Sequence, residues 1–161
     1  IELIIVIVIF GILAVTAAPK FIDIQTDVTI STLQGVKAAV QVGSQLVFAK
    51  SEIANEQKNV NAADETSRVT VNGQAVDTNF GYPHADSVTA VTLAAWVDVT
   101  ATEFDLALTA NSATNSFGIS PVGKTADYAI TDPAGQSCHM LYTNSTGVIS
   151  SPIITIVSGG C

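Results

Sequence analysis

The sequence predicts an α+β fold, in which a long N-terminal helix packs on an antiparallel β-sheet head. The first eighteen residues are apolar at every position except Glu2 and Thr16. From Lys20 to about Ala54, apolar residues recur at helical spacing. The rest of the chain consists mostly of short alternating or apolar runs separated by turn residues. A helix followed mainly by antiparallel strands is the order of an α+β protein.

The stretch Ile1–Ala18 is expected to form a stem, because its eighteen residues would make a helix of roughly 27 Å. A bilayer's hydrocarbon layer is about 30 Å thick. The stretch is longer than the apolar core of a signal peptide, and it carries an acid where such a peptide has a base. We therefore expect residues 1–19 to be retained as a segment that spans a membrane or lies in the core of a filament. Residues 20–161 would form the head, including the second half of the long helix.

Glu2 is the one charge within this stem. It could be a carboxylate that touches water at a membrane surface. Alternatively, it is a buried acid that needs a cation, and leaving a buried charge unpaired costs about 3–5 kcal/mol. The stem contains no base, so the partner would come from another chain or from an N-terminal amine, and Glu2 would then set the register of assembly.

A weak step in the helix is expected between Gly11 and Pro19. Glycine weakens a helix by about 1 kcal/mol relative to alanine, and proline lacks an amide proton and clashes with the carbonyl four residues earlier. In a single chain this segment can stay helical with a kink. In an assembly or under tension it can unwind.

The head is expected to begin with an apolar helical stripe and to continue with strands and turns. The stripe consists of Leu33, Val36, Val40, Gly43 and Val47, widened by Ala39, Leu46 and Ile53, with Lys50 near it. Residues 55–67 and 111–116 are expected to be polar loops, and a hairpin is expected over Val69–Val76 around Asn72-Gly73. A short helix capped by Asp86 or Ser87 would extend to about Val97, and strands are expected at 104–108, 117–120, 128–131, 138–143 and 153–157.

The two cysteines, Cys138 and Cys161, are either free thiols or a disulfide. A membrane-type stem indicates export to an oxidising compartment, where disulfides persist. We therefore expect the pair to be joined, closing a loop worth roughly 3 kcal/mol in the chain-entropy model.

Few other residues point to chemistry. The net charge is −8 and the six cations are scattered, which argues against nucleic-acid binding because that requires clustered cations.

Asp98, Glu103 and Asp105 could hold calcium, but a solvent-exposed face of a loop and strand is the simpler explanation of these acids. His84 and His139 belong to no metal-binding pattern and are expected at the surface or in turns. Residues 144–146 match a glycosylation sequon. No nucleophile or phosphate-binding motif is present, so we expect no enzyme, no metal and no cofactor.

The N-terminal residues resemble those of type IV pilins, at 1–4, at 11–14 and at Pro19. In that family a peptidase removes a short leader and methylates the new terminal phenylalanine. Glu2, Gly11 and Pro19 match the relative spacing of the family's glutamate, glycine and proline, and the family pattern places a few residues before Ile1. The likeness is closest to the mannose-sensitive haemagglutinin pilins, through GILAVTAAPKF at 11–21, STLQGVKA at 31–38, FGYP at 80–83 and the cysteine pair.

The resemblance implies a pilin fold and a structural major subunit of an extracellular filament. It implies that the chain's partners are copies of itself, the pilus assembly machinery and, before assembly, the inner membrane. Surface attachment, biofilm formation and phage reception are the activities it implies. Pseudopilins of type II secretion share the N-terminal pattern and are the first alternative. A membrane-tethered binding domain is the second.

Overall fold

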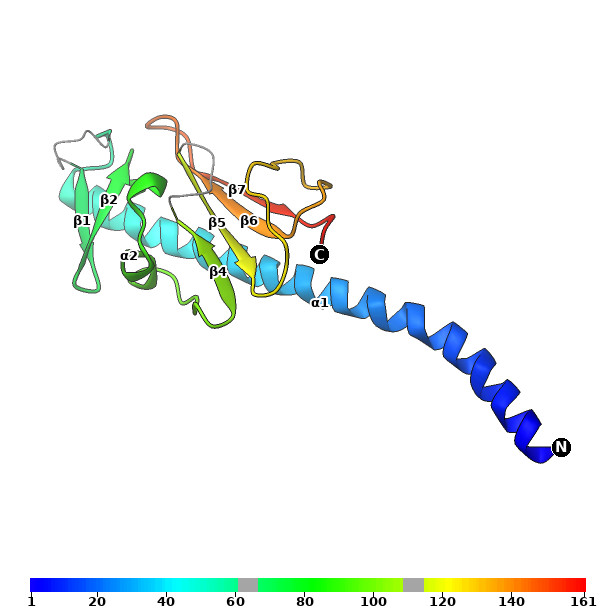
Figure 1. The fold of residues 1–161 in the computed structure, drawn as a ribbon. Coiled ribbons are helices and arrows are strands. Elements are labelled where there is room, and N and C mark those ends of the chain that lie inside the picture. The colour runs from blue at the N-terminus through cyan, green and yellow to red at the C-terminus, as the bar shows by residue number, and fades with distance from the viewer. Residues whose placement is uncertain (61–66, 109–114) are drawn as a thin grey trace.

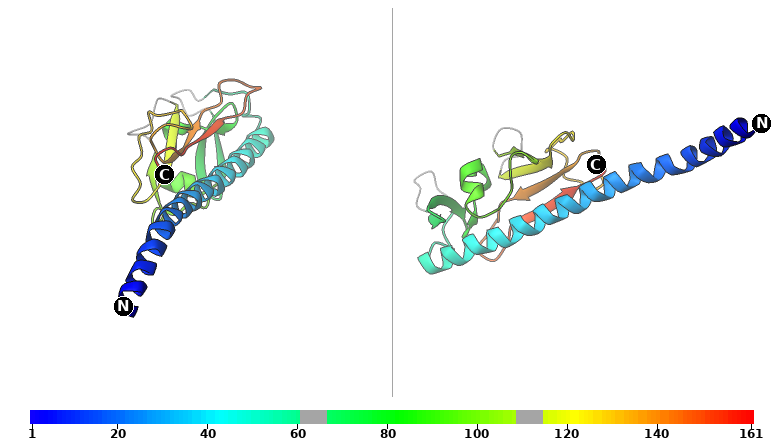
Figure 2. Two further views of the ribbon diagram at one scale, coloured as in Figure 1. Left: turned by 90° about the vertical axis from the view of Figure 1, so that its right-hand side faces the viewer. Right: turned by 90° about the horizontal axis from the view of Figure 1, so that it is seen from below.

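Helix α1 (Glu2–Ala54) runs the length of the molecule, and the head is built along its C-terminal part in this computed structural model (Figure 1). The structure describes residues 1–60, 67–108 and 115–161; for residues 17–23 it gives the helical backbone without the side chains. The N-terminal part of α1 projects past the head and curves away from it (Figures 1 and 2). The backbone is helical throughout this part, so the single chain has no break between Gly11 and Pro19. The expected unwinding in an assembly stays a prediction.

The C-terminus of α1 lies where the sequence predicts it. Asn55 adopts the left-handed conformation with φ 60°, which asparagine tolerates better than most residues. Its N–H bonds the Glu52 carbonyl at 3.2 Å, and the Glu56 N–H bonds the Ser51 carbonyl at 2.9 Å. These bonds satisfy carbonyls that would otherwise be left unpaired at the helix end.

Two antiparallel sheets pack against α1. The first has the order β1-β2-β3, and its strands are β1 (Arg68–Val71), β2 (Gln74–Asn79) and β3 (Tyr82–Pro83). The second has the order β4-β5-β6-β7, and its strands are β4 (Phe104–Ala107), β5 (Ser116–Pro121), β6 (His139–Thr143) and β7 (Ile153–Val157). Edge strand β7 lies beside α1, whereas β4 forms the opposite edge (Figure 2). The α+β architecture, with a long helix on antiparallel sheets, is therefore as predicted.

The hairpin predicted at Asn72-Gly73 is confirmed. Both residues have positive φ, 47° and 79°, as the tight two-residue turn requires. The turn sets the register, with Val71 opposite Gln74 and Val69 opposite Val76. The side-chain amide of Asn72 also donates to the Ala95 carbonyl at 2.7 Å, which fastens the hairpin to the segment after helix α2 (Ala90–Ala94).

The core lies between one face of α1 and the central strands β5 and β6. The α1 side of it is Leu33, Val36, Val40 and Val47, all buried as predicted. On the sheet side the Phe117 and Tyr142 rings stack 4.7 Å apart, and Trp96 meets Phe117 edge-on. The Tyr142 hydroxyl donates to the Pro83 carbonyl at 2.9 Å, which joins the two sheets. Gly43 is needed here, since a Cβ would overlap the Trp96 carbonyl.

The predicted width of the α1 stripe is confirmed for Ala39, which is half-buried against the core, and wrong for Leu46 and Ile53. Leu46 is 46% exposed and Ile53 is 81% exposed. At 100° per residue, both lie nearly opposite Leu33 and Val40 around the helix. The sheets cover only one side of α1, so these residues form a second apolar face and not an extension of the first. Lys50 is exposed and does not join the core.

Three local predictions are also wrong. The cap of α2 is Thr89, in a reciprocal box with Thr92, while residues 85–87 form a separate 3-10 turn, η1 (Ala85–Ser87). Residues 128–131 form no strand, because the Tyr128 ring lies flat on Gly118 of β5 and its hydroxyl donates to Ser120 at 2.9 Å. Strand β3 lies at Tyr82–Pro83, which is not among the segments predicted as strands. The loops expected at 55–67 and 111–116 fall partly outside the described residues.

Candidate functional site

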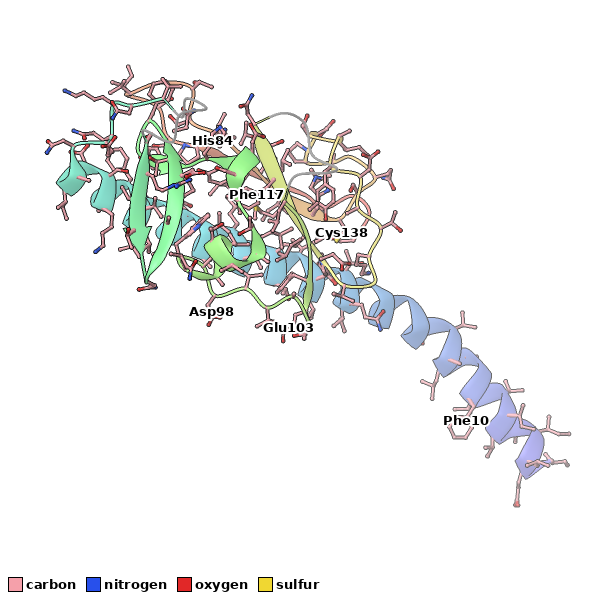
Figure 3. All side chains as sticks on the ribbon, turned by 60° about the vertical axis from the view of Figure 1, so that its left-hand side comes forward. Phe10, His84, Asp98, Glu103, Phe117 and Cys138 are labelled. Atoms are coloured by element: carbon pink, nitrogen blue, oxygen red, sulfur yellow. A yellow bond between two sulfur atoms is a disulfide. The ribbon has the colours of Figure 1, made fainter. Side chains whose placement is uncertain are left out.

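The stem presents apolar side chains to solvent in every direction. Residues 2–16 are all exposed, with Leu3 at 73% and Val15 at 76%. Figure 3 shows Phe10 and its neighbours pointing outward with no other element against them. Burying one such side chain contributes about 1.5–3 kcal/mol. Burial of the stem in lipid or among other protein chains would therefore be strongly favourable.

Glu2 lies in the first turn of α1, where a carboxylate suits the positive end of the helix dipole. Among the residues that the structure describes, no cation forms an ion pair with it. The prediction that its partner lies on another chain or on an N-terminal amine is thus neither met nor contradicted within one chain.

Gly11 is not required by packing in the single chain, since a Cβ at this position would meet no atom within 4 Å. One turn further on, the Thr16 hydroxyl donates to the carbonyls of Ile12 and Leu13 at 3.2 and 3.0 Å. Such back-bonding loosens and bends a helix slightly. The side chain of Pro19 lies outside the described residues. The segment thus combines a glycine without a local packing role and a threonine that competes for helix carbonyls.

A disulfide joins Cys138 to Cys161 across 23 residues, with their Cα atoms 4.8 Å apart. This confirms the predicted pair. Backbone bonds reinforce it: the Gly160 N–H donates to the Ser137 carbonyl and the Ser158 N–H to that of Pro133, each at 3.0 Å. The Lys124 ammonium donates to the Cys161 carbonyl at 2.6 Å. The final residues are thereby held against the loop that leads into β6.

His139 is fully buried beside this disulfide, so the expectation of a surface or turn histidine is wrong for it. Its Nδ1 lies 2.8 Å from the Ser137 hydroxyl, and the Tyr128 ring meets it edge-on at 4.9 Å. Burial lowers the pKa of His139 below the usual value, and the nearby Ile130 carbonyl and Asp127 only partly oppose this. Its neighbour in sequence, Cys138, is the one signal that could have indicated a buried position.

Because the folded pKa of His139 lies below 6.5, the unfolded chain takes up this proton first as pH falls. The stability contributed by neutral His139 is complete above pH 6.5 and is lost as pH falls through the folded pKa. We expect urea unfolding to show a smaller loss of stability from pH 7.5 to pH 5 in a His139→Gln variant than in the native chain. The half-buried second histidine offers the control, a His84→Asn variant measured in the same way. An unchanged slope in His139→Gln would contradict this assignment.

A groove of about 250 Å³ lies over α1, between the edges of β3 and β7. Its walls include Lys37, Gln41 and Gln45 from α1, with Tyr82, Ser151 and Ile154 facing them. The Tyr82 ring stacks on Phe48 at 4.5 Å, and its hydroxyl lies 3.3 Å from that of Ser151. We call this the lysine groove. No sequence pattern indicates this groove, because its residues come from three separate segments.

The remaining candidate sites are not assembled. Within the described residues, no three His, Cys, Asp or Glu side chains lie together as a metal site requires, and Asp98, Glu103 and Asp105 are included in that statement. Asn144 of the sequon is only 4% exposed, and its side-chain oxygen accepts the Ala85 N–H at 2.7 Å. A glycan could not be attached to this buried amide without disturbing the fold.

No family model, curated protein or solved structure matches the chain. Over the part of α1 and α2 whose side chains are described, neither helix has a stretch both long and apolar enough to cross a membrane.

Proposed function

We propose that the chain is the structural major subunit of a helical filament of the type IV pilus kind, and not an enzyme. The observation that carries the proposal is the stem. A folded head with its own core is attached to a helix whose first sixteen residues are exposed and almost entirely apolar. Stems bundled along a filament axis would bury these side chains without covalent links.

The outer face of α1 supports the same role. Its exposed apolar residues fall on a single face, roughly opposite the face that packs on the sheets, because their spacings are close to whole helical turns. They are Ile24, Val28, Val42, Leu46 and Ile53. An apolar face that continues from the stem along the head is suited to burial against neighbouring subunits.

In this proposal the subunit waits in the inner membrane, is taken up by the pilus assembly machinery and becomes part of an extracellular filament. Contacts between different patches of identical subunits generate an open helix. The resemblance to mannose-sensitive haemagglutinin pilins extends the proposal to attachment to surfaces, biofilm formation and phage reception.

Electron microscopy of filaments sheared from cells that make the full chain tests the proposal. We expect long filaments composed of this chain, with the stems at the centre and the backbone unwound between Gly11 and Pro19. Filaments with an unbroken helix would contradict the weak step alone. Short periplasmic assemblies would favour a pseudopilin instead, and a purely membrane-bound monomer would overturn the filament proposal.

A further inference from the structure

We infer that the lysine groove of one subunit receives the acidic edge of a second copy of this chain. The acidic edge is Asp98, Glu103 and Asp105, on and beside strand β4. The inference rests on the proposed filament and adds to it a specific contact between heads.

The groove is suited to a carboxylate. Lys37 is half-buried in it, and among the described residues no acid lies within ion-pair distance of its ammonium. The side-chain amides of Gln41 and Gln45 and the hydroxyls of Tyr82 and Ser151 line the same space. All of these groups can donate hydrogen bonds. A carboxylate accepts such bonds, and bonds to a charged partner are roughly twice as strong as neutral ones.

The acidic edge is free to reach a partner. Asp98, Glu103 and Asp105 are exposed. Glu103 and Asp105 flank buried Phe104, so the strand alternation turns both carboxylates toward solvent. Figure 3 shows Asp98 and Glu103 along the same margin of the head. Within the described residues the only hydrogen bond to Glu103's carboxylate is a long one, 3.4 Å, from the Thr100 hydroxyl.

The two surfaces lie at opposite edges of one sheet. The order β4-β5-β6-β7 puts the acidic edge on the first strand and the groove beside the last. They cannot meet within a single chain. Between copies the contact is heterologous and leaves a free surface of each kind at the two ends, so it can repeat along an open helix.

Apolar side chains accompany the charges on both surfaces. Val122 is 52% exposed, and its N–H donates to the Glu103 carbonyl at 3.0 Å. Ile154 of β7 is half-buried and lines the lysine groove. Contact between the two edges would cover Val122 and Ile154 and exclude water around the ion pair, as the contacts that surround an interface hot spot do.

A charge exchange tests the inference in cells whose only copy is the full chain. We expect Lys37→Glu and Glu103→Lys each to lower the sheared-filament yield at least about fivefold, because each change sets like charges against one another. The double variant should recover most of that yield. Lys58→Glu, which changes an exposed lysine beyond the groove, is the matched control and should behave like the native chain. Membrane-bound subunit with its disulfide intact shows that each variant folds.

Zero-length cross-linking tests the contact directly. A carbodiimide activates a carboxylate, and a touching lysine amine displaces the urea to form an amide. In filaments grown from mixed light and heavy-isotope subunits, we expect mixed-isotope peptides that join Lys37 to Glu103, Asp98 or Asp105. Native filaments without this cross-link and without loss in Lys37→Glu would overturn the inference, as would Lys37 joined only to another protein. Absence of native filaments would instead refute the proposed function.

Discussion

Replacing Glu2 with alanine should leave cells without detectable filaments, while the subunit remains in the membrane at native abundance. The head folds on residues remote from Glu2, so its core and disulfide are untouched by this change. In the assembled state, the variant would leave a cation buried without its acid at every subunit, at a cost of about 3–5 kcal/mol each. Shear fractionation followed by immunoblotting of filament and membrane fractions measures the two pools.

A Glu2→Gln variant separates charge from size and should fail in the same way. Glu52→Ala, an exposed carboxylate at the other end of α1, is the control and should assemble normally. Native filament yield in Glu2→Ala would refute the idea that this acid sets register, although it would leave the apolar cohesion of the stem intact.

Removing the disulfide through Cys138→Ser and Cys161→Ser should destabilise the head by about 3 kcal/mol. The bond spans 23 residues, and the chain-entropy model relates the stabilisation to the length of the loop that is closed. Without the bond, the unfolded chain has a higher conformational entropy, which favours unfolding. In addition, the final residues lose the link that holds them beside β6. Urea unfolding of the detergent-solubilised full chain, followed by tryptophan fluorescence, measures the change.

A reductant supplies the matching control, because it should lower the stability of the native chain to that of the double variant and leave the variant unchanged. Hydrogen exchange should show the greatest loss of protection in residues 122–138 and in the final turn. Equal unfolding midpoints for the native and variant chains would contradict this role of the bond.

The parts of the fold that local sequence predicts are those governed by neighbouring residues. The Asn72-Gly73 turn, the end of α1 near Ala54 and the buried stripe from Leu33 to Val47 all follow from conformational preference or helical spacing. The cysteine pair was predictable from the expected compartment, although geometry alone decides that Cys138 and Cys161 can meet.

The incorrect predictions involve partners that are distant in sequence. Nothing near Tyr128 indicates that its ring covers Gly118 instead of extending a strand. His139 has a polar side chain, yet it is fully buried, with the Tyr128 ring edge-on to it and the Ser137 hydroxyl beside its Nδ1. Leu46 and Ile53 have the right residue type for the core but the wrong angular position, which becomes evident only once the sheets are placed on one side of α1.

The continuity of α1 has a mechanical consequence. The same helix carries the stem and supplies the core residues Leu33, Val36, Val40 and Val47. A pull along a filament would therefore reach the head parallel to these contacts and load them together in shear, not peel them apart one at a time. The weak step between Gly11 and Pro19 lies upstream of them, so it would lengthen first and limit the force that the core receives.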